Sequence, residues 1–120
     1  MREDMLASIL SDLNGSSAEI EASAVISTDG LIMAALLPAN LDEDRVGAMS
    51  AAMLSLGDRT AMELSRGELE MVLIKGNQGY VIMTHAGPEA VVSVQAKSTA
   101  KLGLIFLDIK RAAAAISKLI

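Results

Sequence analysis

Hydrophobic and polar residues recur along this chain with two different periods, and together they predict three helices and five strands. Apolar residues recur at the helical spacing of about 3.6 residues in three segments, residues 2–14, 42–66 and 100–119. Short apolar runs of the kind that form strands occupy residues 20–27, 31–37, 69–75, 80–85 and 90–96. The predicted order is therefore helix, two strands, helix, three strands, helix.

The turns between the strands indicate that neighbouring strands are antiparallel. Asp29-Gly30 separates the first two runs, and a tight hairpin turn needs the positive φ that glycine adopts without strain. Gly76-Asn77-Gln78-Gly79 and Gly87-Pro88-Glu89 separate the last three runs, which predicts a three-stranded meander.

The run from Leu31 to Leu37 is apolar at every position, so its strand must be covered on both faces. We therefore expect an α+β fold: a five-stranded antiparallel sheet with helices on both faces, in the order αββαβββα. The middle helix is expected on one face and the two terminal helices on the other. A length of 120 residues fits a single domain over residues 1–120.

The predicted middle helix carries two apolar stripes, although one is enough to dock a helix on its own sheet. We expect the larger side chains to face the sheet: Val46, Met49, Met53, Leu56, Thr60 and Leu64. A second stripe consists mostly of small residues, namely Ala48, Ala51, Ala52, Ser55, Arg59 and Met62. Small side chains suit close helix–helix contact, as Gly47 and Gly57 also would, so this stripe predicts a self-interface.

The amino-acid composition excludes some classes of function and favours others. Hydrophobic residues make up 52% of the chain, more than a lone small domain needs, which favours a partner interface. A net charge of -5, with no Trp, one Tyr and one Phe, argues against nucleic-acid binding. The longest apolar run has seven residues, far short of the roughly 20 of a membrane span, so we expect a cytoplasmic protein that does not insert into membranes. Residues 97–120 contain five basic residues and one acidic residue, whereas the rest of the chain has more acidic than basic residues.

The chain contains few of the residues and motifs that catalytic sites use. It has no cysteine, a single histidine and no P-loop motif, so we expect no enzyme activity, no metal and no cofactor. Asp42-Glu43-Asp44 fits an acidic first helical turn better than a cation site. His85 has no acid in the three residues before it and is expected to be a surface or edge residue rather than a general base.

Residues 100–113, Ala-Lys-Leu-Gly-Leu-Ile-Phe-Leu-Asp-Ile-Lys-Arg-Ala-Ala, closely resemble the last helix of the Roadblock/dynein light chain family. Asp29-Gly30-Leu31 and the order of elements resemble that family too. Gly103 matches a family glycine that permits close packing of this helix on the sheet. The chain departs from the family at Lys101, where Asn is frequent, and at Ile32-Met33, where Pro often follows the Leu. The resemblance implies a Roadblock/profilin-like three-layer sandwich.

The resemblance also implies a non-enzymatic homodimeric regulator or scaffold that binds a small Ras-like GTPase. Family dimers pair their third strands and set their middle helices side by side. The interface residues implied here are Ala48, Ala51, Ala52, Ser55, Met62, Leu69, Met71 and Leu73. Exposed candidates for GTPase contact are Arg45, Asp58, Arg59, Glu63 and Arg66. Two alternatives stay open: a purely structural dimerisation or adaptor module, and a small-molecule sensor.

Overall fold

The computed structural model describes residues 1–120 and contains the three helices and five strands expected from the sequence. The elements are α1 (Arg2–Ser16), β1 (Ile20–Ser27), β2 (Ile32–Leu36), α2 (Glu43–Glu63), β3 (Val72–Gly76), β4 (Gly79–His85), β5 (Ala90–Lys97) and α3 (Leu102–Ser117). All strand pairs are antiparallel, in the order β2-β1-β5-β4-β3. The predicted α+β class and element order are confirmed.

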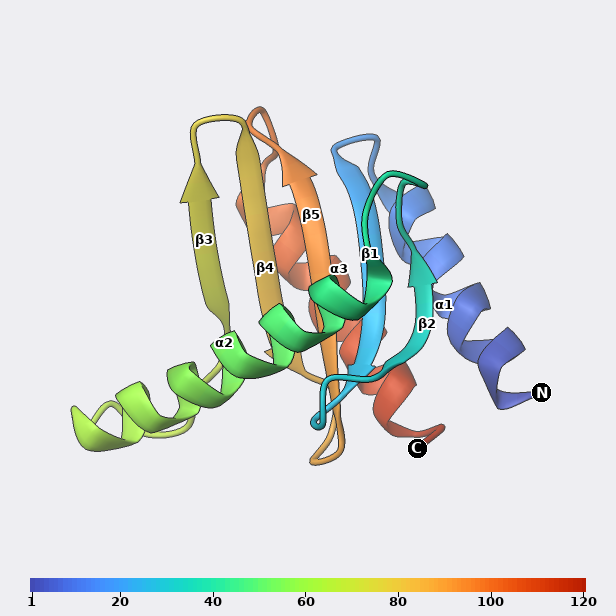
Figure 1. Cartoon of the computed structure of the whole chain (residues 1–120). Coiled ribbons are helices and arrows are strands. Elements are labelled where there is room, and N and C mark those ends of the chain that lie inside the picture. The colour runs from blue at the N-terminus through green and yellow to red at the C-terminus, as the bar shows by residue number, and fades with distance from the viewer.

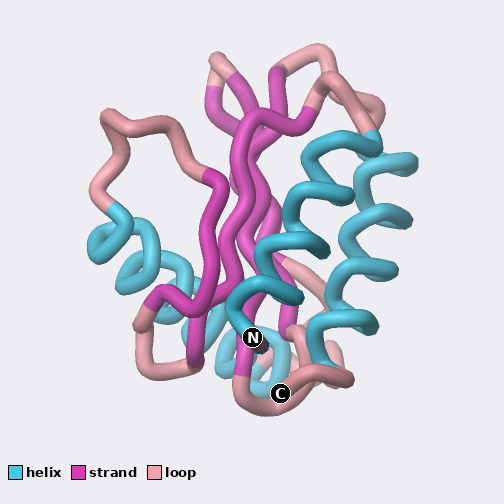
Figure 2. Tube along the Cα trace, turned by 90° about the vertical axis from the view of Figure 1, so that its right-hand side faces the viewer, coloured by secondary structure: helices cyan, strands magenta, loops and turns pink.

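The molecule has three layers, with α2 alone on one face of the sheet and α1 and α3 together on the other (Figures 1 and 2). This is the predicted placement of the helices. The sheet leaves two strands at its edges, β2 and β3. None of the helices is both long and apolar enough to cross a membrane.

The two faces of the sheet are buried to very different extents. The core between the sheet and the α1–α3 pair contains 16 buried residues, led by Leu6, Leu10, Ile82, Ile105 and Ile109. The core beneath α2 contains only five: Ala24, Ile26, Leu54, Met83 and Val91. A single helix therefore covers the α2 face of the sheet incompletely.

Residues next to each end of α2 determine where the helix begins and where it ends. At the start, the carboxylate of Asp42 accepts hydrogen bonds from the backbone N–H of Asp44 (3.0 Å) and of Arg45 (3.4 Å), so Asp42 is the N-cap. Glu43 and Asp44 then form the acidic first turn that the sequence predicted. At the end, Ser65 adopts φ 58°, and Arg66 N–H donates to the carbonyl of Ala61 in a Schellman motif. The helix thus ends at Glu63, short of the predicted Arg66, and Ser65 is the left-handed residue that ends it.

The glycines of α2 serve contacts within the chain and not contact with a second helix, contrary to our expectation. A Cβ on Gly57 would lie 2.8 Å from Cγ2 of Val72 and 3.0 Å from Cδ2 of Leu69. A Cβ on Gly47 would lie still closer to the β1–β2 turn, 2.5 Å from the carbonyl oxygen of Gly30. Their missing side chains let α2 approach its own sheet.

The start of α3 also differs from the prediction. Gly103 is exposed and a Cβ there would meet nothing within 4 Å, so this glycine is not required for packing on the sheet. Ser98 and Thr99, which could have capped this helix, precede it without capping it, and the Thr99 hydroxyl donates to Glu19 (2.6 Å). Lys101 stands at the N-cap without a side-chain hydrogen bond.

Candidate protein-interaction site

Helix α2 crosses the sheet obliquely, and its C-terminal half extends beyond the edge strand β3 (Figure 1). Its buried residues are Val46, Gly47, Ser50 and Leu54, a row at the helical spacing that lies against the sheet. The larger predicted stripe is therefore wrong as the docking face: Val46 is buried and Met53 half-buried, but Met49, Leu56 and Leu64 are exposed. Val46 and Leu54 pack on the sheet beside the small residues Gly47 and Ser50, whereas Met49, Leu56 and Leu64 are left exposed.

An apolar groove of about 450 Å³ runs between α2 and the neighbouring strands. Met49, Ala52 and Met53 line it from the helix. Ile74 and Val81 line it from β3 and β4. A second hollow of about 360 Å³ lies beneath the overhanging end of α2, where its apolar lining includes Leu56, Leu64, Leu69, Met71 and Val72. The uncovered surface is therefore one apolar strip that follows α2 to the edge of the sheet.

The edge strand β3 pairs with β4 alone, so one row of its backbone N–H and C=O groups has no partner in the sheet. Leu73 and Ile74 are adjacent in the strand, point to opposite faces and are both exposed. The strand begins at Val72, so the predicted edge residues Leu69 and Met71 precede it. Leu69 lies under Gly57 instead, which explains why the chain reaches the sheet later than its apolar pattern suggests.

The small residues predicted to form one interface stripe follow one another at helical spacing on the side of α2 away from the sheet, with a different hollow on each flank. Ala52 lines the apolar groove, whereas Ala51 and Ser55 line a separate hollow of about 150 Å³ beside His85. Ala48 and Met62 are exposed. The residues that border the open strip on the β3 side are mostly the large ones, Met49, Met53 and Leu56.

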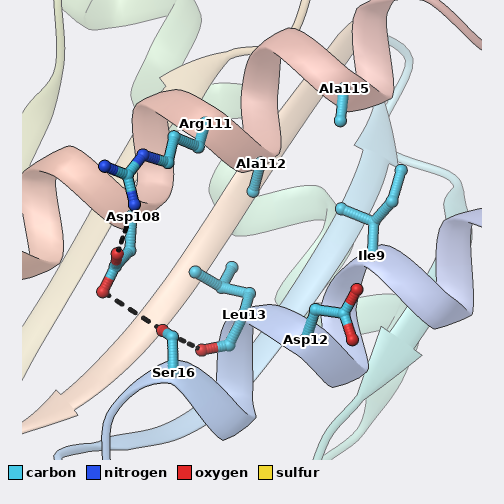
Figure 3. A pocket seen from close by; sticks show the side chains of 8 residues that line it. All are labelled: Ile9, Asp12, Leu13, Ser16, Asp108, Arg111, Ala112 and Ala115. Atoms are coloured by element: carbon cyan, nitrogen blue, oxygen red, sulfur yellow. Dashed lines mark hydrogen bonds and ion pairs between the residues drawn. The ribbon is translucent and has the colours of Figure 1, made fainter.

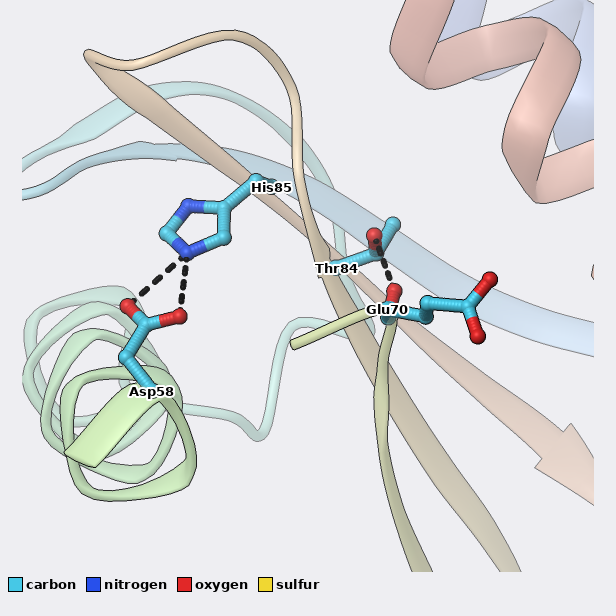
Figure 4. A network of polar contacts seen from close by, with 4 residues as sticks. All are labelled: Asp58, Glu70, Thr84 and His85. Carbon is cyan, nitrogen blue, oxygen red and sulfur yellow. Dashed lines mark hydrogen bonds and ion pairs between the residues drawn. The ribbon is translucent and has the colours of Figure 1, made fainter. Parts of the chain in front are cut away.

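Asp58 and His85 are joined across the layers, a contact that the sequence analysis missed (Figure 4). Nε2 of His85 lies 2.9 Å from both carboxylate oxygens of Asp58, while its Nδ1 is buried without a hydrogen-bond partner. The side chain of His85 is 35% exposed and that of Asp58 is 43% exposed. Asp58 is thus engaged within the chain, whereas we expected a free surface residue. Its separation of 27 residues from His85 leaves no local signal of the contact.

The other charged candidates on α2 do not form one cluster. Arg59 pairs with Glu63 at 3.0 Å on the exposed surface near the end of the helix. Arg66 donates from Nε to the Leu64 carbonyl (3.0 Å), beyond the helix end. Arg45 lies in the first turn, about 21 Å from Arg59 along the helix axis at 1.5 Å per residue. Of these side chains, Arg66 borders the apolar strip, at the hollow beneath the end of α2.

Comparison with known proteins identifies the family. The Roadblock/LC7 domain model matches residues 6–96. An uncharacterized protein of Methanocaldococcus jannaschii is 38% identical over 109 residues, which cover 91% of this chain and 94% of that protein.

Among solved structures, MglB of Myxococcus xanthus superposes with a TM-score of 0.88 at 18% identity, covering 98% of this chain and 92% of MglB. A Roadblock/LC7 domain from Streptomyces avermitilis gives a TM-score of 0.87 at 16% identity, covering 93% and 94% of the two chains. These two likenesses concern the fold. The family match and the sequence identity to the archaeal relative also establish membership: the chain belongs to the Roadblock/LC7 domain family.

Proposed function

We propose that this chain acts, as a single domain, as a non-catalytic regulator or adaptor that forms a homodimer through β3 and α2 and binds a small Ras-like GTPase on the α2 face. The observation that carries the proposal is the overhang of α2. The exposed apolar residues of this overhang lie next to an apolar groove that a second copy could fill with the same residues.

The first step is strand pairing. If β3 pairs antiparallel with β3 of a second copy, about a two-fold axis perpendicular to the sheet, the unpaired backbone groups of both edges are satisfied. The result is a continuous sheet of ten strands, five from each copy. Leu73 and Ile74 then lie in the interior of that sheet, which accounts for apolar side chains on both faces of an edge strand.

The second step concerns the helices. A two-fold axis perpendicular to the sheet leaves both α2 helices on the same face. Because α2 projects past β3, its end is carried over the partner's sheet, where Leu56 and Leu64 reach the partner's apolar strip. The same contact places Met49 and Ala52 near the partner's helix. Burial of this strip would supply the cover that α2 alone does not give its face of the sheet.

The GTPase site is proposed on the outward surface of the paired α2 helices. Arg45, the Arg59–Glu63 pair and Arg66 are exposed there, and their charges can orient a partner. Arg59 and Arg66 already bond to groups of this chain, so they suit rim contacts better than insertion into a phosphate site. Asp58 contributes by fixing α2 on β4, not by direct contact.

A binding assay tests the GTPase step. Purified Ras-like GTPases of the same genome, each loaded with GDP or with a non-hydrolysable GTP analogue, are titrated against the immobilised protein. We expect one of them to bind, and to bind the two nucleotide states with different affinities, because a regulator must distinguish those states. Arg45→Glu is expected to weaken binding, whereas Lys110→Glu, on the opposite side of the sheet, is expected to leave it unchanged.

Equal affinity for both nucleotide states would contradict regulation and leave a scaffold. Failure of every GTPase to bind would contradict the GTPase assignment and favour a structural dimerisation module.

A further inference from the structure

We propose that the outward side of α3 binds an acidic amphipathic helix of a protein partner. This surface, the α3 face, consists of Lys101, Leu104, Leu107, Lys110 and Arg111. It lies across the sheet from α2 and is independent of the dimer and GTPase surfaces proposed above.

The apolar part of the α3 face has no partner within the chain. Leu104 is 62% exposed and Leu107, about one helical turn further on, is 48% exposed. The neighbouring Gly103 leaves open space above the backbone. Two exposed leucines beside a glycine allow another helix to approach α3 closely, which the contacts of this chain do not use.

The surface beside these leucines is hollowed. α1 and α3 pack antiparallel, and two hollows of about 260 Å³ and 360 Å³ lie along the seam between them. Both are lined by Ser16, Asp108 and Arg111, so they form successive parts of one trough. Figure 3 shows the three side chains at the seam: the Ser16 hydroxyl donates to Asp108 (3.1 Å), and Arg111 lies 4.0 Å from the same carboxylate. A trough between two packed helices is a shape that accepts a third helix.

The charge of the α3 face indicates what that helix carries. Five bases against one acid give residues 97–120 a net charge of +4. Within residues 97–120 the one acid, Asp108, is already bonded to Ser16 and faces Arg111. Two carboxylates from outside that stretch also line the trough: Glu19 accepts a hydrogen bond from Thr99, and Asp12 lies in the part of the trough that Lys101 does not reach. Lys101 and Lys110 are exposed and form no ion pair. Unpaired cations on both sides of two exposed leucines match a helix with an apolar stripe flanked by carboxylates.

Charge and shape also select this occupant over two others. A second copy packed antiparallel on α3 about Leu104 and Leu107 would bring Lys101 of each copy toward Lys110 of the other, and like charges repel. A lipid surface favours a protruding apolar face, whereas Leu104 and Leu107 line a hollow.

The test uses a defined probe, a synthetic helical peptide of about 18 residues with leucines at helical spacing flanked by glutamates. Backbone amide shifts of the isotope-labelled protein are followed by NMR during the titration. We expect saturable binding, with the largest shifts in residues 101–111 and near Ser16, and affinity that falls with added salt. A second peptide with lysine in place of every glutamate is expected not to bind.

Two variants separate this site from general charge attraction. Lys110→Glu is expected to weaken peptide binding at least about tenfold, while Arg2→Glu, at an exposed base in the first turn of α1, leaves it unchanged. Leu107→Ser is expected to weaken binding as well, because the leucine is an apolar anchor. Unchanged melting temperatures identify the variants as folded.

Three results would overturn the proposal: no saturable binding, shifts centred away from α3, or equal loss of affinity in Arg2→Glu and Lys110→Glu. A fourth measurement addresses the lipid alternative. Sedimentation with phosphatidylcholine vesicles containing phosphatidylserine that depends on Lys110, in a protein that does not bind the peptide, would assign the α3 face to a membrane instead.

Discussion

A Cβ atom placed on Gly47 would lie 2.5 Å from the carbonyl oxygen of Gly30, so the first half of α2 rests directly on the turn between β1 and β2. The turn itself needs a glycine, because Gly30 adopts φ 90°. The hairpin signal in the sequence and the position of α2 are therefore coupled through two backbones that no side chain separates.

Gly47→Ala is expected to destabilise the protein by about 2–3 kcal/mol, because backbone atoms cannot yield to the added methyl group as a flexible side chain would. Gly103→Ala is the matched control. It also lies in a helix, but a methyl group there meets nothing, so the substitution should stabilise by about 0.5–1 kcal/mol. Urea unfolding of both variants measures the difference, and equal effects would contradict the contact described for Gly47.

The pair formed by Asp58 and His85 is expected to contribute about 0.5–1 kcal/mol, because both side chains are partly exposed and water screens their interaction. A double-mutant cycle with Asp58→Ala and His85→Ala isolates this coupling from the effect of each substitution. The coupling should decrease at high salt. Strict additivity of the two substitutions would mean that the contact does not hold α2 on β4.

Ala52→Glu is expected to weaken the dimer, because Ala52 lines the apolar groove that the partner's helix would cover. The effect should be greatest at low salt, where the two introduced carboxylates repel most strongly. Ala114→Glu makes the same change on the exposed side of α3 and should leave the dimer intact. Dissociation constants from sedimentation equilibrium compare the two variants, and equal constants would place the interface elsewhere.

The protein alone is expected neither to bind nor to hydrolyse GTP, since the chain contains no P-loop motif. Isothermal titration with GTP and Mg²⁺ checks binding, and phosphate release checks hydrolysis. Micromolar affinity for GTP would contradict an adaptor role and indicate a nucleotide site within this chain.

The element order could be predicted because each strand and helix has a local signal: a period, a turn glycine or a cap such as Asp42. The orientation of α2 could not. Both of its sides carry apolar residues, and periodicity alone does not show which of Leu54 and Leu56 is buried. Large apolar residues on the exposed side of α2 fit a surface that binds a partner. The hydrophobic pattern of one sequence does not distinguish residues of the chain's own core from residues of such a surface.

The candidate site was predictable only in part, for the same reason. The sequence indicated a strand near Leu73 and Ile74, but not that this strand lies at the edge of the sheet with apolar side chains exposed on both faces. The start of β3 was misplaced because Leu69 and Met71 continue the apolar pattern, while Leu69 packs under α2 before the strand begins. The Asp58–His85 contact joins different elements and leaves no trace in local sequence.

The central claim, that the open strip along α2 and β3 is covered by a second copy, is tested most directly by the mass of the protein in solution. Sedimentation velocity at micromolar concentration should give a species of twice 12.5 kDa. Ile74→Lys, which puts a charge in the proposed seam, should shift the population toward monomer. A single species of 12.5 kDa for the unaltered protein at that concentration would contradict the account.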